Sequence, residues 1–174
     1  MKILIIPLFF LLNLKVDMVD RNKNGVEVAI NNLTTELISK YSSSCKANVA
    51  ILQFRTSDDK ISRCNQLIQN QVKECFSNAK NFKVIEQYSI NHLVDESGWN
   101  LESASSYSVY SSLNESIFDS TGELADVFVY GTVIVEGEKV LVSAFLIPNG
   151  NSSNAIKATV HIPVSDVPKS MLDD

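Results

Sequence analysis

Residues 48–86 read NVAILQFRTSDDKISRCNQLIQNQVKECFSNAKNFKVIE, and they predict the central unit of the fold. The run 48–54 is almost continuously apolar, which is typical of a strand buried on both faces of a sheet. After the polar loop RTSDDK, apolar residues recur every three or four positions from 61 to 79, which predicts a helix with Ser62 as its N-cap. Residues 82–86 alternate apolar and polar side chains, as a strand does. A strand, a helix and a strand within about forty residues predict a βαβ unit with parallel strands.

Helices are predicted on both sides of this unit. Apolar residues at three- and four-residue steps across 26–41 predict an amphipathic helix before the first strand. After the second strand, Ser89 is expected to cap a short helix that the pair Ser97-Gly98 ends. Segment 104–124 is rich in Ser, but its apolar residues keep helical spacing, which predicts one or two helices instead of a linker. The residues of that stripe are Tyr107, Tyr110, Leu113, and Ile117 or Phe118.

The C-terminal part predicts antiparallel strands. Residues 126–135 and 139–147 are β-branched runs joined by a tight turn that contains Gly137, which indicates a hairpin. The Asn149-Gly150 pair marks a second turn before a last strand over 155–162. The predicted fold class is therefore α/β, with a mixed β-sheet of about five strands covered by helices. A βαβ unit is followed by a C-terminal antiparallel meander.

The N-terminus is predicted to be a signal or leader segment over residues 1–20. Lys2 precedes an apolar stretch over 3–14, which matches a signal-peptide core and is shorter than the ~20 residues that span a bilayer. The alternative is a buried N-terminal core segment. We expect one α/β domain over 26–168 and a tail over 169–174.

Composition narrows the function classes. The net charge is −5, from 15 Lys and Arg against 20 Asp and Glu, and no basic run offers a continuous face to phosphates, so we expect no nucleic-acid partner. Three cysteines are an odd number, so at least one thiol is free. Cys64 and Cys75 lie about 16 Å apart along one predicted helix, too far for a disulfide. Small buried hydrophobes are the better interpretation of these cysteines.

Few residues suggest catalysis. His92 shares a helix face with Asp95 and Glu96, an arrangement that is more typical of an exposed polar surface than of a metal site. His161 is expected to face outward from the last strand. The sequence has no G-x-S-x-G elbow and no phosphate-binding loop, so no catalytic, metal or cofactor-binding residue is assigned and no cofactor is expected. Trp99 is the one candidate for contact with a partner, and the alternative is that it closes one end of the core.

The strand patterns also resemble a known family. The runs KANVAILQF, FKVIEQYSINHLVDE and GELADVFVYGTVIVEGEKVLVSAFLI are similar, in that order, to the bacterial envelope domain shared by the flagellar protein FlgO and the curli secretion lipoprotein CsgG. The penicillin-binding-protein activator LpoB and the N-terminal domain of TolB have related folds. Gln87 and Phe145 stand where that family usually has Arg.

This resemblance implies a non-enzymatic accessory protein of the periplasm or of the periplasmic face of the outer membrane. Such a protein would bind an envelope protein partner and help to assemble flagellar, curli-like or cell-wall machinery. Membrane association through the N-terminal segment is a further expectation. Two alternatives stay open: a hydrolase that uses Cys45 or a serine, and a subunit of a homo-oligomeric ring that pairs through its last strand.

Overall fold

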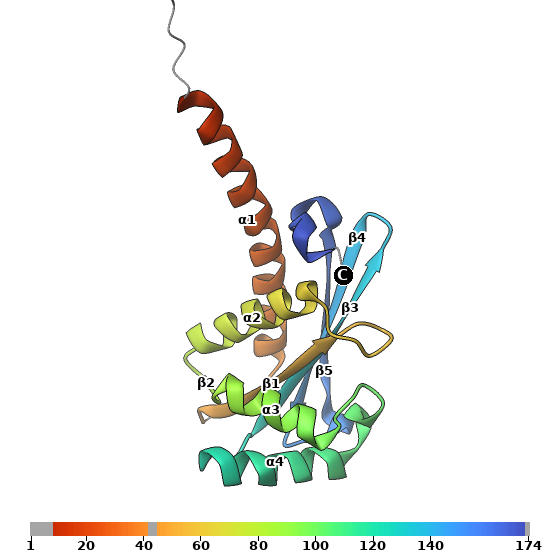
Figure 1. The fold of residues 1–174 in the computed structure, drawn as a ribbon. Helices are drawn as coiled ribbons and strands as arrows, with labels where there is room; N and C mark the ends of the chain where they lie inside the picture. The colour runs from red at the N-terminus through yellow and green to blue at the C-terminus, as the bar shows by residue number, and fades with distance from the viewer. Residues whose placement is uncertain (1–8, 42–44, 173–174) are drawn as a thin grey trace, which may run out of the picture.

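The computed structural model describes residues 9–41 and 45–172, and the side chains of 25–41, 45–86 and 89–172 within them (Figure 1). Four helices and five strands follow the predicted order. They are α1 (Phe9–Lys40), β1 (Ala47–Arg55), α2 (Arg63–Asn78), β2 (Phe82–Val84), α3 (Gln87–Ser97), α4 (Tyr107–Thr121), β3 (Val127–Glu136), β4 (Lys139–Pro148) and β5 (Ile156–Pro163). Short 3-10 turns lie at Ser103–Ser105, Ser152–Asn154, Val164–Asp166 and Lys169–Met171.

The strands form one mixed sheet in the order β2-β1-β3-β4-β5. Strand β1 pairs in parallel with β2 and β3, and β3, β4 and β5 pair antiparallel. The β3–β4 hairpin closes at the pair Glu136–Lys139, where Gly137 takes the positive φ of 59° that a two-residue turn needs. The predicted fold class, a βαβ unit followed by an antiparallel meander, is confirmed.

The order of the strands decides which helices cover which face. The chain steps from β1 to β2 in one direction and then back across β1 to β3. Right-handed crossovers therefore place α2 and the α3–α4 pair on opposite faces of the sheet, as Figure 1 shows. One core joins α1 and α2 to β1, β3, β4 and β5, and a second core joins α3 and α4 to β1, β3 and β4.

Several predicted boundaries were wrong. Strand β2 ends at Val84 instead of residue 86, although the Ile85 amide still donates to the Val49 carbonyl at 3.0 Å. Helix α3 begins at Gln87, so Ser89 lies inside the helix and is not its cap. The Glu86 carboxylate accepts from the Ser89 amide at 2.7 Å. A carboxylate suits this place because the first amides of a helix have no partner within it.

Helix α4 confirms part of the predicted stripe. Tyr110, Leu113 and Ile117 are buried, whereas Tyr107 is 63% exposed and Phe118 is 51% exposed. Tyr107, the first residue of α4, was therefore wrongly assigned to the buried stripe. The helix ends at Thr121, a few residues earlier than predicted, where Gly122 takes a φ of 73°.

Helix α1 is longer than the predicted helix over 26–41. Val26, Ile30, Leu33 and Leu37 are buried as their spacing predicts, and the helical backbone extends back to Phe9. The leader predicted for 1–20 falls on residues 1–8, which lie outside the described residues, and on 9–20, whose side chains do as well. Among the described residues, no helix combines the length and apolar content that crossing a bilayer requires.

Candidate functional site

One face of the antiparallel half of the sheet is left open by the helices. Helices α3 and α4 pack together and cover β1, the start of β3 and the end of β4. Helix α1 lies on the other face of the sheet, against β5. Strand alternation fixes which side chains project from the uncovered side. We call this surface the open sheet face, and its residues are Tyr130, Thr132, Ile134, Leu141, Ser143, Phe145, Lys157, Thr159 and His161. Apart from the buried Ser143, these residues are half-buried or exposed.

A row of aromatic and cationic side chains crosses this face. The register places Tyr130 opposite Phe145, and Phe145 opposite Lys157. The Tyr130 and Phe145 rings therefore stack, with centroids 4.9 Å apart and planes at 14°, and Lys157 Nζ lies 5.3 Å from the Phe145 ring centre. Trp99 meets Tyr130 edge-on at 5.5 Å, and the Arg55 guanidinium lies 5.5 Å from the centre of the Trp99 ring. Stacked rings and cation–π contacts hold these side chains in place without a partner.

Tyr130 is a neutral part of the row. The pKa of a tyrosine hydroxyl is ordinarily well above neutral pH, and burial raises the pKa of Tyr130 further. The row therefore carries positive charge at its two ends and none in its aromatic centre at neutral pH.

Arg55 is fixed by the protein itself and is not available to a partner. Its side chain is 12% exposed, its Nε donates to Gln53 Oε1 at 3.1 Å, and its Nη1 lies 3.3 Å from Asp59 Oδ2. Asp59 adopts a φ of 63° and accepts from the Leu101 amide at 3.2 Å. These bonds hold the loops after β1 and α3 against each other, which leaves Lys157 as the accessible cation of the row.

Trp99 packs into the second core and is 2% exposed. Its place agrees with the alternative in which it closes one end of the core. Contact between Trp99 and a partner stays a prediction, and nothing below depends on it.

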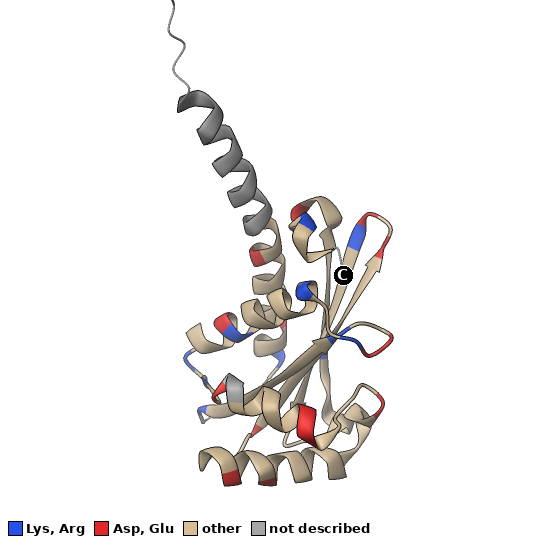
Figure 2. Cartoon of the chain, viewed as in Figure 1, with Lys and Arg blue, Asp and Glu red and all other residues tan. Residues whose placement is uncertain are grey.

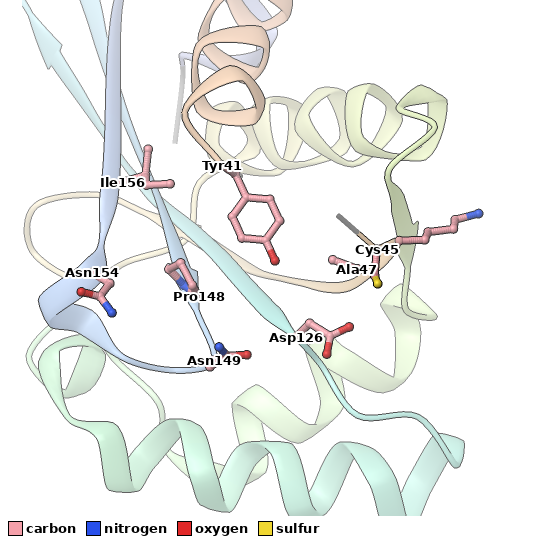
Figure 3. Close-up of a pocket in the computed structure, with 9 residues that line it drawn as sticks. Tyr41, Cys45, Ala47, Asp126, Pro148, Asn149, Asn154 and Ile156 are labelled. Atoms are coloured by element: carbon pink, nitrogen blue, oxygen red, sulfur yellow. The ribbon is translucent and has the colours of Figure 1, made fainter. Parts of the chain in front are cut away.

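A polar pocket of about 510 Å³ lies at the opposite end of the sheet, where β1 and β3 begin and β4 ends (Figure 3). Tyr41, Cys45, Asp126 and Asn149 are among its lining residues. Asp126 serves the fold here, because its Oδ2 accepts from the Asn48 amide at 2.8 Å and its carbonyl accepts from the Asn149 amide at 2.7 Å. The pocket does not bring either histidine to Cys45: His92 is on α3 and His161 is on the open sheet face.

The other residues weighed for chemistry are separated in space. His92 Nδ1 lies 3.3 Å from Glu96 Oε2 with both side chains more than half exposed, as the surface interpretation predicts. Asp95 turns away to accept from Gln53 Nε2 at 2.6 Å. Among the described residues, no three His, Cys, Asp or Glu side chains are placed to hold a metal ion. Lys and Arg are interspersed with Asp and Glu over the described part of the chain (Figure 2).

All three cysteines are present as thiols. Cys64 is buried, as the sequence interpretation expects, whereas that interpretation is wrong for Cys45, which is exposed, and holds in part for Cys75, which is half-buried. Burial is the main cause that raises the pKa of the Cys75 thiol, whose Sγ donates to Asn31 Oδ1 at 2.8 Å. A raised pKa disfavours the thiolate, so this thiol is a poor nucleophile at neutral pH.

No protein-family model and no curated protein sequence matches the chain. Solved structures do match it. The C-terminal domain of LpoB from Salmonella enterica aligns with a TM-score of 0.52 at 12% identity, over 78% of this chain and 97% of that domain. The Escherichia coli LpoB C-terminal domain aligns with a TM-score of 0.51 at 11% identity and the same coverage. The solution structure of E. coli LpoB aligns at 0.51 and 12% identity, over 78% of this chain and 66% of that protein.

This chain has the fold of the LpoB C-terminal domain. The predicted relation to LpoB is therefore confirmed at the level of fold, while membership of the FlgO and CsgG family stays a prediction. Sequence reasoning missed the aromatic row. Its signal lay in the strand alternation, which puts Tyr130 and Phe145 on one side of the hairpin.

Proposed function

We propose that this chain is a non-enzymatic accessory domain of a bacterial cell envelope, which binds a protein of the cell-wall machinery. The observation that carries the proposal is the fold shared with the LpoB C-terminal domain, which this chain matches over 97% of that domain. LpoB is the penicillin-binding-protein activator among the proteins that the sequence resembles. A penicillin-binding protein is accordingly the proposed partner, and the periplasm or the periplasmic face of the outer membrane is the proposed location.

The open sheet face is the proposed docking surface. Aromatic side chains are enriched at protein interfaces because they bury a large area at a small cost in conformational entropy. Phe145 is half-buried and already stacked on Tyr130, so little of its freedom remains to be lost on binding. Ile134 and Leu141 add apolar area farther along the same face, beyond the pair of Thr132 and Ser143.

The charge of the open sheet face indicates which kind of partner surface fits it. Lys157 projects from β5 on this face and is exposed, so it brings a positive charge to the surface. A partner that fits would present an apolar patch bordered by Asp or Glu. Such charges at the rim set specificity and the rate of association more than the affinity.

Fluorescent labelling of penicillin-binding proteins tests the partner directly. Envelope membranes from the source bacterium are labelled with a fluorescent penicillin and passed over immobilised full-length chain. We expect the wild type to retain a fluorescent band. The double variant Lys157→Glu/Thr159→Glu should lose it, because both changed residues are exposed on the open sheet face.

Lys80→Glu is the control for the charge reversal at Lys157, since it makes the same Lys-to-Glu change at an exposed position in the connection between α2 and β2. Retention of a different envelope protein would contradict the proposed partner and leave protein binding intact. Loss of the band with Lys80→Glu would contradict the proposed docking surface. Retention of no envelope protein by the wild type would contradict the binding function.

Location is tested by fractionation of tagged full-length protein followed by N-terminal sequencing. We expect the chain in the envelope fraction with residues 1–20 removed or serving as an anchor. A purely cytosolic distribution would contradict the proposed export.

A further inference from the structure

A second recess lies where ligands bind in open α/β sheets. The connection after β1 runs to α2 on one face, and the connection after the neighbouring parallel strand β2 runs to α3 on the other face. Adjacent parallel strands whose connections diverge in this way leave a crevice outside their carboxyl ends. Here the crevice is a cleft of about 370 Å³ between α2 and α3. We call it the amide cleft, and its lining residues are Gln53, Ile61, Gln66, Gln69, Asn70, Asn91 and Asp95.

The lining of the amide cleft is polar but almost uncharged. Five of its seven described residues carry primary amides, one carries a carboxylate and none is basic. Asn and Gln together make up 21 of the 174 residues of the chain, so a lining with five amides among seven residues is strongly enriched in them. A primary amide offers two N–H donors and a carbonyl acceptor with two lone pairs. The cleft can therefore both donate and accept hydrogen bonds without selecting an ion.

The inner amides are buried and held in position. Gln53 is 5% exposed and Gln69 is 7% exposed. Gln53 Nε2 donates to Asp95 Oδ1 at 2.6 Å while its Oε1 accepts from Arg55. Gln69 Nε2 donates to Asn91 Oδ1 at 3.2 Å, which joins α2 to α3 across the cleft. Side chains oriented in this way bind a ligand with a small loss of their own conformational entropy.

Gln66 and Asn70 complete the cleft from its rim. Both are exposed and lie four residues apart on α2, so they project from the same side of the helix. A ligand seated on the buried amides would reach these two side chains as well. The cleft thus has a fixed floor and an accessible wall of the same chemistry.

We infer that the amide cleft binds a neutral, polyhydroxylated ligand, such as a sugar unit of a glycan. Hydroxyl groups donate and accept at the same atom, which matches paired amides and the Asp95 carboxylate. Phosphates and other anions are disfavoured, because the described lining has no cation to neutralise them. An extended peptide would need apolar pockets for its side chains, and Ile61 is the single apolar residue of the described lining. The volume lies at the lower end of the range of about 300–1,000 Å³ for small-molecule sites, which suits a short saccharide.

The amide cleft and the open sheet face share no residue, so this inference does not depend on the partner proposed above. Nitrogen-15 NMR titration of the full chain with N,N′-diacetylchitobiose tests it. We expect the side-chain amide signals of Gln53 and Gln69 to shift, with saturation in the millimolar range or below. The double variant Gln66→Ala/Asn70→Ala should weaken binding by about tenfold, because it removes two hydrogen-bonding side chains from the wall of the cleft.

Gln71→Ala is the matched control, because Gln71 is an amide of the same helix that does not line the amide cleft. It should leave both the affinity and the shifts unchanged. The inference is overturned if the disaccharide causes no shift at a concentration of roughly tens of millimolar, which is about 20-fold above the expected dissociation constant. It is also overturned if Gln66→Ala/Asn70→Ala binds as tightly as the wild type, or if the neutral peptide triglycine shifts the same signals at lower concentration.

Discussion

At the scale of single residues, one β-bulge accounts for the position of Gln53. Ile51 pairs with Val129, but Phe54 pairs with Gly131, so β1 has one more residue than β3 over this step. The extra residue lets Leu52 and Gln53 both point to the side of α3. Gln53 therefore reaches Asp95, and the chain resumes its alternation afterwards. A bulge of this kind directs a side chain without a change of fold.

Gly131 lies opposite Phe54, where pairing between β1 and β3 resumes after the bulge. A Cβ at this position would lie 2.1 Å from Phe54 Cε1 and 2.7 Å from the Ser143 carbonyl oxygen. We expect Gly131→Ala to lower the free energy of unfolding by about 1–3 kcal/mol through overpacking. Gly122→Ala is the comparison, since its Cβ meets nothing within 4 Å and only its φ of 73° is unfavourable, at about 1 kcal/mol. Urea unfolding measures both, and equal stability of Gly131→Ala and wild type would contradict the packing described.

The loop after β1 contains a carboxylate with a low pKa. The Lys60 ammonium, 2.5 Å away, and the Thr56 hydroxyl lower the pKa of Asp58 from 3.8 to about 2. Since the folded pKa is below the ordinary one, any stability from this carboxylate is present above pH 3.8 and is lost as the pH falls towards 2. We expect carbon-13 NMR titration to give this low value, and Lys60→Ala to raise it. A wild-type Asp58 that titrates at its ordinary pKa would contradict the contact.

At the scale of elements, sequence periodicity predicted those helices and strands whose apolar residues pack against a single neighbouring layer of the fold. Helix α2 is of this kind, and its predicted spacing was confirmed. The β3–β4 hairpin packs into both cores and was predicted from its β-branched runs and its Gly turn, and it was confirmed as well. The end of β2 was not predictable, because Ile85 is 2% exposed and keeps the apolar pattern after the strand has ended. The start of α3 was missed because a glutamate cap resembles an ordinary strand residue in sequence.

The two proposed sites were harder to predict than the elements. Sequence alone does not distinguish Tyr130 and Phe145 from core residues, since alternation cannot tell a covered face of a sheet from an open one. The polar residues of α2 likewise read as a solvated helix face. Only the opposite placement of α2 and α3 turns those amides into the wall of a cleft.

Substitution of the N-cap residue of α2 tests a predicted element directly. The Ser62 hydroxyl accepts from the Asn65 amide at 3.2 Å, as the sequence predicted. We expect Ser62→Ala to destabilise the fold by about 1 kcal/mol. Ser77→Ala is the control on the same helix, because the Ser77 hydroxyl is exposed and donates to the Lys73 carbonyl, a bond that adds little stability. Thermal unfolding compares them, and an equal effect of the two variants would contradict the cap.

At the scale of the whole molecule, the domain has three layers over its parallel half and two over its antiparallel half. Helices cover both faces of β1, whereas β5 is covered on one face, by α1. This asymmetry leaves the open sheet face on one half and the amide cleft on the other. Protein docking and ligand binding would therefore occupy separate surfaces of one rigid scaffold.

We propose that the open sheet face docks an envelope protein. Site-specific photo-cross-linking in living cells tests it most directly, with the cross-linker placed in the full-length chain at Thr159 or at Ser120. Both positions are exposed, but Thr159 lies on the open sheet face and Ser120 lies near the end of α4. We predict an adduct with a penicillin-binding protein from Thr159 and none from Ser120. No adduct from Thr159, or the same adduct from both positions, would contradict the account.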